Sequence, residues 1–328
     1  MKFKLLVSIV LICLVMCVML SIMIGFVDYS FKELIYRLLF DDLSLRREII
    51  INIRLPRALA AAMVGGTLAV CGVVTQAVAR NPMADPYLMG VSSGASLGAM
   101  ICLLVFGGSI GSFGLSSSAF LGALLSSSLI LAMSFKTSAS VYHMILIGIA
   151  INALCSSLGS LLIYLSNDAN LLRTLVFWLM GSLAPASWEN LFWVFLASFI
   201  GLIFFIANSR NINLINLSDD EAISLGLSPK NFRLLCLVFV ALMTASSVAF
   251  FGMIGFVGII VPHILRFLFG GDHIALLPLS FFSGGCFLVL VDLLARSIAT
   301  SEIPLGVITG LLGSPFFFWL LLGKWRVS

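Results

Sequence analysis

Long apolar blocks separated by short polar segments run through the whole chain. Because a helix needs about 20 apolar residues to cross the hydrocarbon core of a bilayer, each block of that length is a candidate span. The pattern predicts ten such helices, at residues 5–27, 58–79, 88–107, 115–135, 143–165, 191–208, 233–251, 252–269, 275–296 and 305–323. We therefore predict an all-α fold, that of a polytopic membrane protein with about ten transmembrane helices.

One apolar block, residues 233–269, is far longer than a single crossing needs at about 1.5 Å of rise per residue. The chain must fold back within this block, and the run Gly252, Gly255, Gly258 is the natural place for the turn. The span after the turn is then short. Its ends are expected to meet irregular backbone that other parts of the protein shelter from lipid.

Small residues recur at four-residue spacing in two of the predicted spans. Gly90, Gly94 and Gly98 form one such row, and Gly306 and Gly310 form another. Helices in lipid associate by close van der Waals packing, so rows of this kind mark helix contacts. The spacing predicts a compact bundle.

The first block, Leu5–Val27, follows the basic residues Lys2 and Lys4. A signal peptide has a similar order of features, but its apolar region holds about 7–15 residues and an A-x-A-like cleavage site follows it. Here the block is longer and no such site follows. We interpret it as an uncleaved first span whose basic end lies in the cytoplasm.

Composition agrees with a lipid environment. Hydrophobic residues make up 61% of the 328 residues and charged residues only 10%, against about 25% in an ordinary soluble domain. The net charge of +4 is too small and too scattered to indicate a nucleic acid partner. The seven cysteines lie almost entirely in apolar blocks without a C-x-x-C pair, which favours packing over a disulfide framework or a metal site.

The charges between the spans give a weak signal for orientation. With both termini in the cytoplasm, ten basic residues lie inside and eight outside, which is a small excess under the positive-inside rule. Six of the eight outside residues fall in the segment 32–57. Either the topology differs, or basic residues are kept outside for a reason, such as an acidic partner.

Sequence motifs for enzymatic chemistry are missing or misplaced. No phosphate-binding G-x-x-x-x-G-K-[ST] occurs, so ATP chemistry would have to come from another chain. Residues 90–94 match G-x-S-x-G, but a nucleophile elbow needs a strand, a turn and a helix, and this match begins a membrane span. Its glycines suit helix packing, and its serines are candidates for the wall of a wetted pathway.

Two polar motifs flank the second predicted span. Arg54-Leu55-Pro56-Arg57 precedes it, and composition alone favours an arginine pair that anchors the helix end, with proline in the first turn. Asn81-Pro82-Met83-Ala84-Asp85-Pro86 follows it, and its two prolines break the helix while Asn and Asp bond freed backbone groups. This second motif is either an ordinary turn or, at the mouth of a bundle, a gate.

Two further polar motifs lie in the second half of the chain. In the loop 218–230, Ser218 is a candidate N-cap with Glu221 as its capping-box partner, and Gly226 can end the short helix. Such a helix is well placed to contact a soluble protein, with a solvated loop as the alternative. Asp292 and Arg296 are four apart and can pair on one helix face, as a functional site or as an interfacial anchor.

Taken together, these segments resemble the permeases of the iron-chelate and cobalamin ABC import family. The resemblance rests on Arg54–Arg57, on Gln76 with Arg80–Pro86 and Gly90–Ala95, on Trp178–Ser182, on Leu225-Gly226, on Gly255–Arg266, on Asp292 with Ala295-Arg296, and on Glu302–Gly306. The motifs occur in the family's order and cover most of the chain.

This resemblance implies a type II ABC importer permease fold. Residues 1–328 would form one transmembrane permease domain with two structurally related halves, roughly 1–190 and 191–328. The implied partners are a second permease copy or a paralogue, two cytoplasmic ATPase subunits that carry ATP and Mg, and an extracytoplasmic substrate-binding protein. The chain itself would be a transport subunit and not an enzyme, with no cofactor or metal of its own, in the cytoplasmic membrane of a prokaryote with both termini inside.

The resemblance also assigns roles to single residues. Arg54, Arg57 and Arg296 would dock the binding protein, which would explain basic charge outside the membrane. Asn81 and Met83 would form the cytoplasmic gate, with the turn near residues 137–140 as a second layer. The loop that couples to the ATPase would comprise Asp219, Asp220, Glu221, Ala222, Leu225 and Gly226.

The expected function is translocation of an iron chelate such as a ferric siderophore, with haem or cobalamin as alternative cargo. The pathway wall would be apolar with scattered polar groups, namely Thr67, Thr75, Gln76, Ser92, Ser96, Asn152 and Ser156. An ion-coupled secondary transporter or a membrane-embedded enzyme would need ionisable groups clustered within the spans, and the sequence places none there.

Overall fold

The computed structural model describes residues 2–25, 28–40, 45–106, 111–136, 141–166, 169–298 and 301–322, and within these ranges every regular element is a helix. The elements are α1 Lys2–Met23, α2 Phe31–Phe40, α3 Leu45–Ile49, a π-helical turn η1 Ile50–Arg54, α4 Leu55–Ala79, a 3-10 turn η2 Pro86–Met89, α5 Val91–Phe106, α6 Gly111–Lys136, α7 Val141–Leu165, α8 Ala169–Leu179, α9 Trp188–Ala207, α10 Ser209–Ile215, α11 Asp219–Ser224, α12 Pro229–Phe251, α13 Val257–Phe269, α14 His273–Ser297 and α15 Leu305–Leu322.

Ten of these helices are the predicted spans. Seven helical stretches are long and apolar enough to cross a membrane, and α5, α13 and α15 are shorter apolar helices. All ten coincide with the apolar blocks of the sequence, so the prediction of a ten-span, all-α membrane protein is confirmed. The short helices α2, α8, α10 and α11 lie between spans.

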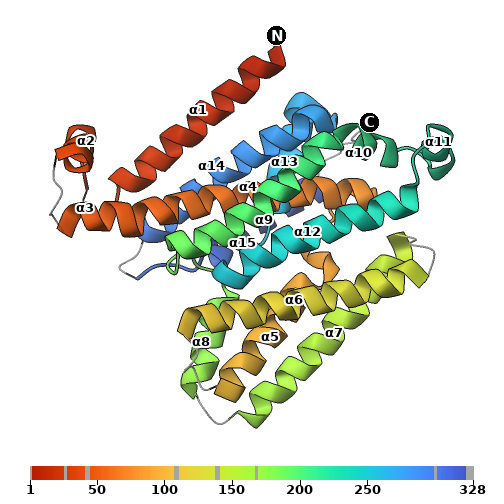
Figure 1. The fold of residues 1–328 in the computed structure, drawn as a ribbon, viewed down its shortest axis with the longest axis horizontal. Helices are drawn as coiled ribbons and strands as arrows, with labels where there is room; N and C mark the ends of the chain where they lie inside the picture. Colours follow the sequence, from red (N-terminus) through yellow and green to blue (C-terminus); the bar gives the residue numbers. More distant parts are fainter. Residues whose placement is uncertain are drawn as a thin grey trace.

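Helix α4 is the centre of the bundle. It is almost wholly buried, and α1, α9, α12, α13 and α14 all pack on it (Figure 1). Small residues allow the close approach: a Cβ added at Gly72 would lie 2.0 Å from the Gly258 carbonyl oxygen of α13, and one at Gly65 would lie 2.2 Å from the Gly284 oxygen of α14. Backbone-to-backbone packing of this kind drives helix association in lipid.

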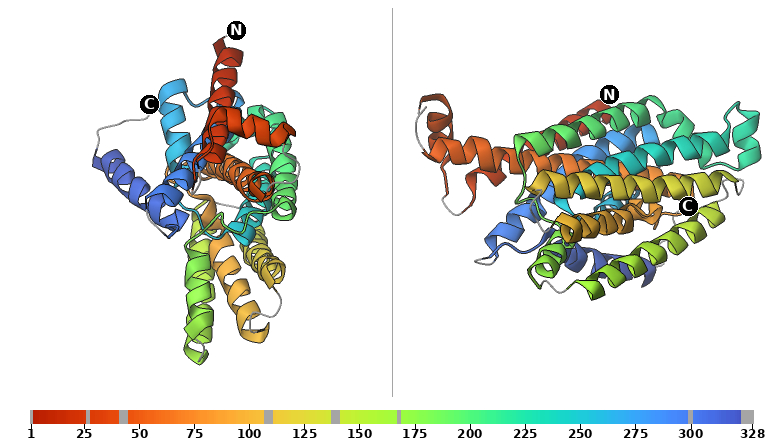
Figure 2. Two further views of the ribbon diagram at one scale, coloured as in Figure 1. Left: turned by 90° about the vertical axis from the view of Figure 1, so that its left-hand side faces the viewer. Right: turned by 60° about the horizontal axis from the view of Figure 1, so that its bottom comes forward.

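A second layer, α5 to α8, lies on one side of the bundle, with α6 between α12 and the pair α5 and α7 (Figure 2). The predicted glycine row joins α5 to α6, because a Cβ added at Gly94 or Gly98 would lie 2.4 or 2.2 Å from a backbone oxygen of α6. A Cβ added at Gly306 would likewise lie 2.5 Å from the Met180 carbonyl oxygen. At Gly310 no atom of the described part of the chain lies within 4 Å of an added Cβ, so the predicted contact there does not form within this chain.

The second span begins earlier than its hydropathy predicts. A continuous helical stretch runs from Leu45 to Ala79, and in its π-helical turn the Leu55 N–H donates to the Ile50 carbonyl. Pro56 follows directly, and the wide turn accommodates a residue that lacks an N–H and crowds the preceding turn. The arginines of the R-L-P-R motif therefore lie inside a long helix rather than at its interfacial start.

The turn predicted between α12 and α13 forms at residues 252–256, where Gly252 and Phe256 have positive φ. This stretch and the last residue of α12 meet two other segments, the loop residues 180–182 and residues 304–306 at the start of α15. The Ser182 N–H donates to the Phe251 carbonyl, and the N–H groups of Leu305 and Gly306 donate to the Gly181 and Met180 carbonyls, each at 2.9 Å. We call these three segments the backbone junction. They satisfy one another's polar groups inside the protein, as predicted.

Candidate functional site

Charged groups gather at opposite ends of the bundle, which we call the α2 end and the α11 end after the helices that mark them (Figure 1). At the α2 end, Asp292 of α14 is fully buried between two arginines. Arg57 of α4 donates to it through Nε and Nη2 at 3.0 and 2.9 Å, and to both oxygens of Glu302 at 2.7 and 2.9 Å. Arg296 pairs with Asp292 at 3.1 Å, as its four-residue spacing predicts.

Arg296 and a third arginine, Arg54, also fix the end of α1. Arg54 donates to the Ile22 carbonyl at 2.8 Å and lies 4.8 Å from the centre of the Tyr29 ring. Arg296 donates to the Ser21 hydroxyl at 2.8 Å. Arg54, Arg57, Asp292, Arg296 and Glu302, which we call the arginine cluster, therefore join α1, α4, α14 and the segment before α15.

The cluster is more buried than a docking patch of free arginines would be. Arg54 and Arg57 are each 8% exposed, whereas the Glu302 side chain is 47% exposed at the rim. Three arginines and two carboxylates leave one formal positive charge. Sequence reasoning had paired Asp292 only with Arg296 and had given Glu302 no role, because nothing in the spacing links residues 57, 292 and 302.

Because Glu302 pairs with Arg57, we expect the free energy of unfolding to depend on pH. Hydrogen bonds from Arg57 hold the pKa of Glu302 below its usual range. A carboxyl group with a lowered folded-state pKa stabilises the protein above its unfolded pKa of about 4.3, and this contribution is lost as the pH falls through the folded pKa. Because Glu302 is half-exposed, the contribution stays below about 1 kcal/mol.

Thermal unfolding in detergent between pH 7 and about 3.5, followed by tryptophan fluorescence, tests this prediction. We expect Glu302→Gln to lie below the wild type near neutral pH and to converge with it in acid. If the unfolding midpoints of the wild type and Glu302→Gln differ by the same amount at every pH, the ionised Glu302 carboxylate does not stabilise the folded protein through Arg57.

At the α11 end, the segment 81–86 after α4 forms a turn that is held by side-chain hydrogen bonds to the backbone. Asn81 accepts the Met83 N–H on its side-chain oxygen at 2.9 Å, and Asp85 accepts the Tyr87 N–H at 2.8 Å as the N-cap of η2. The Tyr87 hydroxyl donates to the Ile254 carbonyl in the backbone junction at 3.1 Å. The turn is therefore anchored at one side in the centre of the bundle. The second gate layer expected at residues 137–140 lies outside the described residues.

The acidic loop forms the short helix that the sequence predicts. Ser218 and Glu221 make both hydrogen bonds of a capping box at the start of α11, and Gly226 after the helix has a φ of 85°. The bonds from Ser218 lower the pKa of Glu221. Ala222 is buried under the helix, whereas Leu225 is 60% exposed. An exposed, capped helix with an apolar tip is suited to contact with another protein.

One carboxylate fastens α11 to the rest of the bundle. Asp219 accepts hydrogen bonds from Arg233 of α12 at 2.6 and 3.1 Å and from Arg80, the residue after α4, at 2.7 Å. The bonds from Arg233, ahead of those from Arg80, lower the pKa of Asp219. Neither partner was predicted from the sequence, because both contacts depend on tertiary packing.

The seven polar residues expected along a pathway wall fall into two groups. Thr67, Thr75 and Gln76 are at most 4% exposed inside the subunit. The Thr67 and Thr75 hydroxyls donate to the carbonyls of Met63 and Cys71, and the Gln76 amide donates to the Gly258 carbonyl. The expectation for these three is therefore corrected: they serve contacts within and between helices.

The other four expected wall residues remain accessible. Ser92 and Ser96 on α5 and Asn152 on α7 are partly exposed, and Ser156 on α7 is exposed. Asn152 accepts a hydrogen bond from the Ser93 hydroxyl at 2.5 Å, which joins the two helices. The polar groups that could meet a hydrophilic cargo therefore lie on the outer face of α5 and α7.

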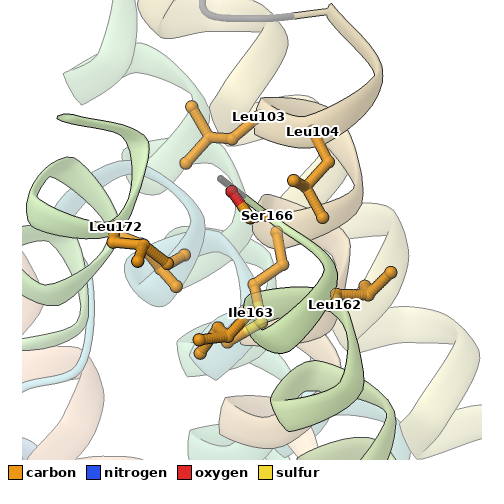
Figure 3. Close-up of a pocket in the computed structure, with 8 residues that line it drawn as sticks. Leu103, Leu104, Leu162, Ile163, Ser166 and Leu172 are labelled. Carbon is orange, nitrogen blue, oxygen red and sulfur yellow. The ribbon is translucent and has the colours of Figure 1, made fainter. Parts of the chain in front are cut away.

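The cavities described within the chain do not suit a large polar cargo. Between α5, α7 and α8, Leu103, Leu104 and Leu162 surround a pocket of about 20 Å³ near Ser166 (Figure 3), which is room for about one water molecule. A cleft of about 530 Å³ opens between α6, α9 and α12, with Phe120, Trp193 and other apolar side chains on its wall. Its lining carries no charged group and suits apolar chains.

A buried central helix, apolar spans around it and charged clusters at the two ends define a polytopic membrane protein. The model of the FecCD transport family matches residues 13–323, and the chain belongs to this family.

Three relatives illustrate the relationship. The probable iron chelatin transport system permease protein of Helicobacter pylori is 38% identical over 281 residues, 86% of this chain and 84% of that protein. The hemin transport system permease protein HmuU of Yersinia pestis is 38% identical over 330 residues, 97% and 96% of the two chains. The vitamin B12 import system permease protein BtuC of Salmonella paratyphi A is 39% identical over 288 residues, 87% of each.

A solved structure has the same fold. A metal-chelate type ABC transporter in an inward-facing conformation superposes with a TM-score of 0.87 at 34% identity, and the match covers 97% of this chain and 98% of that one. PsaBC from Streptococcus pneumoniae shares the fold at a TM-score of 0.60 and 17% identity. The chain is therefore a membrane-spanning ABC permease subunit, and members of this class are transport subunits rather than enzymes.

Proposed function

We propose that this chain is the permease subunit of an ATP-driven importer that carries an iron chelate, a ferric siderophore first, across the cytoplasmic membrane of a prokaryote. The family membership and the relatives that transport iron chelates, haemin and vitamin B12 support this function. The observation that carries it is the pair of separate contact sites, the arginine cluster at one end of the bundle and the exposed helix α11 at the other (Figure 1).

The proposed orientation places the α11 end in the cytoplasm and the α2 end outside. This orientation follows from the roles proposed for the two ends. Basic residues favour it only by a small excess, because Arg80, Lys136, Arg210 and Lys230 lie at the α11 end but the basic segment 32–57 lies at the α2 end. Both termini would be cytoplasmic. Two ATPase subunits with ATP and Mg would bind at α11, with Asp220, Ile223 and Leu225 exposed toward them. No cofactor of the chain's own is needed for this role.

The proposed pathway lies between two permease subunits, identical or paralogous, rather than inside one chain. The partly exposed polar residues Ser92, Ser96, Asn152 and Ser156 would face it, and Asn81 and Met83 would close its cytoplasmic side. A weakly polar wall of this kind binds cargo loosely, so the external binding protein would set selectivity. The division into two related halves at about residue 190 completes the proposed architecture.

Docking of the binding protein is proposed at Arg54, Arg57 and Arg296. Because Glu302 caps Arg57 at the exposed rim, an acidic side chain of the partner would reach Arg57 by displacing Glu302. We therefore predict opposite effects at the two positions. Arg57→Gln weakens docking by about tenfold or more and reduces its salt dependence, whereas Glu302→Gln strengthens docking.

The affinity of the detergent-purified permease for the loaded binding protein, measured at two salt concentrations, tests the docking site. A thermal unfolding curve for each variant separates lost docking from lost folding. If the wild type, Arg57→Gln and Glu302→Gln bind the binding protein with equal affinity, the arginine cluster is not part of the docking site.

ATP hydrolysis by the complex in lipid vesicles tests the function itself, with and without a binding protein loaded with ferric siderophore. Stimulation and uptake of the chelate are expected. If only haem- or cobalamin-loaded binding proteins stimulate ATP hydrolysis, the chain is still an importer permease, but its cargo is haem or cobalamin and not a ferric siderophore. Uptake that persists without any ATPase partner would favour an ion-coupled carrier instead.

A further inference from the structure

Arg80 occupies a backbone position that favours glycine. It directly follows α4 with a φ of 48°, and Arg80 and Phe256 are the two non-glycine residues with positive φ in the described part of the chain. Side chains make the left-handed conformation costly, so helices commonly end with glycine at this position. The turn itself is made by backbone bonds, from Arg80 N–H to the Ala77 carbonyl and from Asn81 N–H to the Gln76 carbonyl. The reason for an arginine here must therefore lie in its side chain.

The Arg80 side chain crosses from the end of α4 to the start of α11. Its guanidinium donates to the Ile215 carbonyl at 2.9 Å, to the Leu217 carbonyl, and to Asp219 at 2.7 Å. It thus holds the last turn of α10, the linker to α11 and the first residue of α11 with one rigid planar group. Arginine is suited to this task because its five N–H donors have a fixed geometry.

Arg233 completes the connection from α12. Its side chain is 5% exposed, and it binds both oxygens of Asp219. In the described part of the chain, α11 otherwise packs on α10 and α12. The bridge through Asp219 and Arg80 therefore joins α11 directly to the residue that precedes Asn81 and Met83.

We propose that Arg80 is a positioning residue that transmits movement of α11 to the gate segment 81–86. This inference rests on the proposed function, in which α11 contacts an ATPase and Asn81 and Met83 form the gate. When α11 moves, the carboxylate of Asp219 pulls on the guanidinium of Arg80, and the strained turn at Arg80 carries the displacement into Asn81. The other end of the segment is held by Tyr87 in the backbone junction, so the segment must change shape rather than shift as a whole.

The substitution Arg80→Gly separates the side chain's role from that of the turn. Glycine relieves the left-handed strain and preserves the turn, so the variant is expected to fold. It removes the bridge, so import is expected to fall by roughly 5- to 100-fold, the range of ordinary coupling free energies. ATP hydrolysis by the assembled complex should continue. Arg80→Asn is a second variant, because asparagine also tolerates the left-handed region.

Two further variants calibrate the result. Arg210→Ala removes the same charge from an exposed position on the neighbouring helix α10 and is expected to import at the wild-type rate. Arg80→Lys keeps the charge and one of the donors, so partial recovery of import is expected. Import by Arg80→Lys at the full wild-type rate, together with a loss in Arg210→Ala as large as that in Arg80→Gly, would reduce the effect to net charge and overturn the proposal.

A readout at the gate tests the link itself. In a Met83→Cys background the new thiol is labelled with a water-soluble maleimide in the complex, with and without a non-hydrolysable ATP analogue, against the unmodified chain as background. The labelling rate is expected to respond to the nucleotide when Arg80 is present and to lose that response when Arg80→Gly is added. An equal nucleotide response with and without Arg80→Gly, or import by Arg80→Gly at the wild-type rate, would overturn the link and leave the proposed function standing. A wild-type complex without nucleotide-dependent import would instead remove the proposed function.

Discussion

Replacing Asp292 by asparagine is expected to destabilise the protein by about 3–5 kcal/mol, the usual cost of removing one partner from a buried ion pair. Asp292 is fully buried and faces both Arg57 and Arg296. Asparagine has nearly the same shape but no charge, so the two guanidinium groups would face each other without the carboxylate between them. Glu302 would still bind Arg57, whereas Arg296 would keep its bonds to Ser21 and to the backbone carbonyl of residue 292.

Thermal unfolding in detergent, followed by tryptophan fluorescence, measures this effect. A fall in midpoint of roughly 5–15 °C corresponds to the expected loss. Asp220→Asn is the matched control, because it makes the same chemical change at an exposed position of α11 and should change stability by less than about 0.5 kcal/mol. An Asp292→Asn protein as stable as this control would mean that the arginines are solvated or partnered elsewhere.

The spans of this protein could be predicted from sequence because the requirement is local. A block of apolar residues with the length of a bilayer crossing has few alternatives in lipid. The α11 capping box and the pairing of Asp292 with Arg296 were also predictable, since both rest on three- or four-residue spacings. In each case the partners are neighbours along one helix.

The start of the central helix could not be predicted in this way. Residues 45–57 carry several charges and a proline, so hydropathy places them outside the span, yet they continue α4 through a π-helical turn. The bundle makes this possible by burying Arg54 and Arg57 against α1 and α14. Their partners lie more than 30 and more than 230 residues away along the chain.

Polar residues within the spans were misassigned for a related reason. A threonine in a membrane helix is equally able to face a pathway or to bond the carbonyl four residues before it, and the sequence does not distinguish the two. In the structure Thr67 and Thr75 make the internal bond. Short helices such as α8 and α10 were missed because they lack the length of a span.

Replacing Gly252 by alanine is expected to cost about 2–6 kcal/mol, from backbone strain of about 1–3 kcal/mol and a steric clash of similar size. Gly252 ends α12 with φ 71° and ψ −168°, a conformation open essentially to glycine alone. An added Cβ would lie 2.1 Å from the Trp178 carbonyl oxygen and 2.9 Å from the Gly181 Cα. All of these atoms are backbone, so no side chain can rotate to make room.

Gly255 provides the matched control within the same turn. Its φ is not positive, and no atom within the described part of the chain lies within 4 Å of an added Cβ. Gly255→Ala should therefore fold with a midpoint close to that of the wild type, whereas Gly252→Ala should unfold at a much lower temperature or fail to accumulate in the membrane. Equal stability of the two variants would show that α12 and α13 can be joined without the close contact at Trp178. The segments 180–182 and 304–306 are hydrogen-bonded to each other beside this turn. Room for the added Cβ at residue 252 would then have to come from a shift of α8 and α15 together, away from α12.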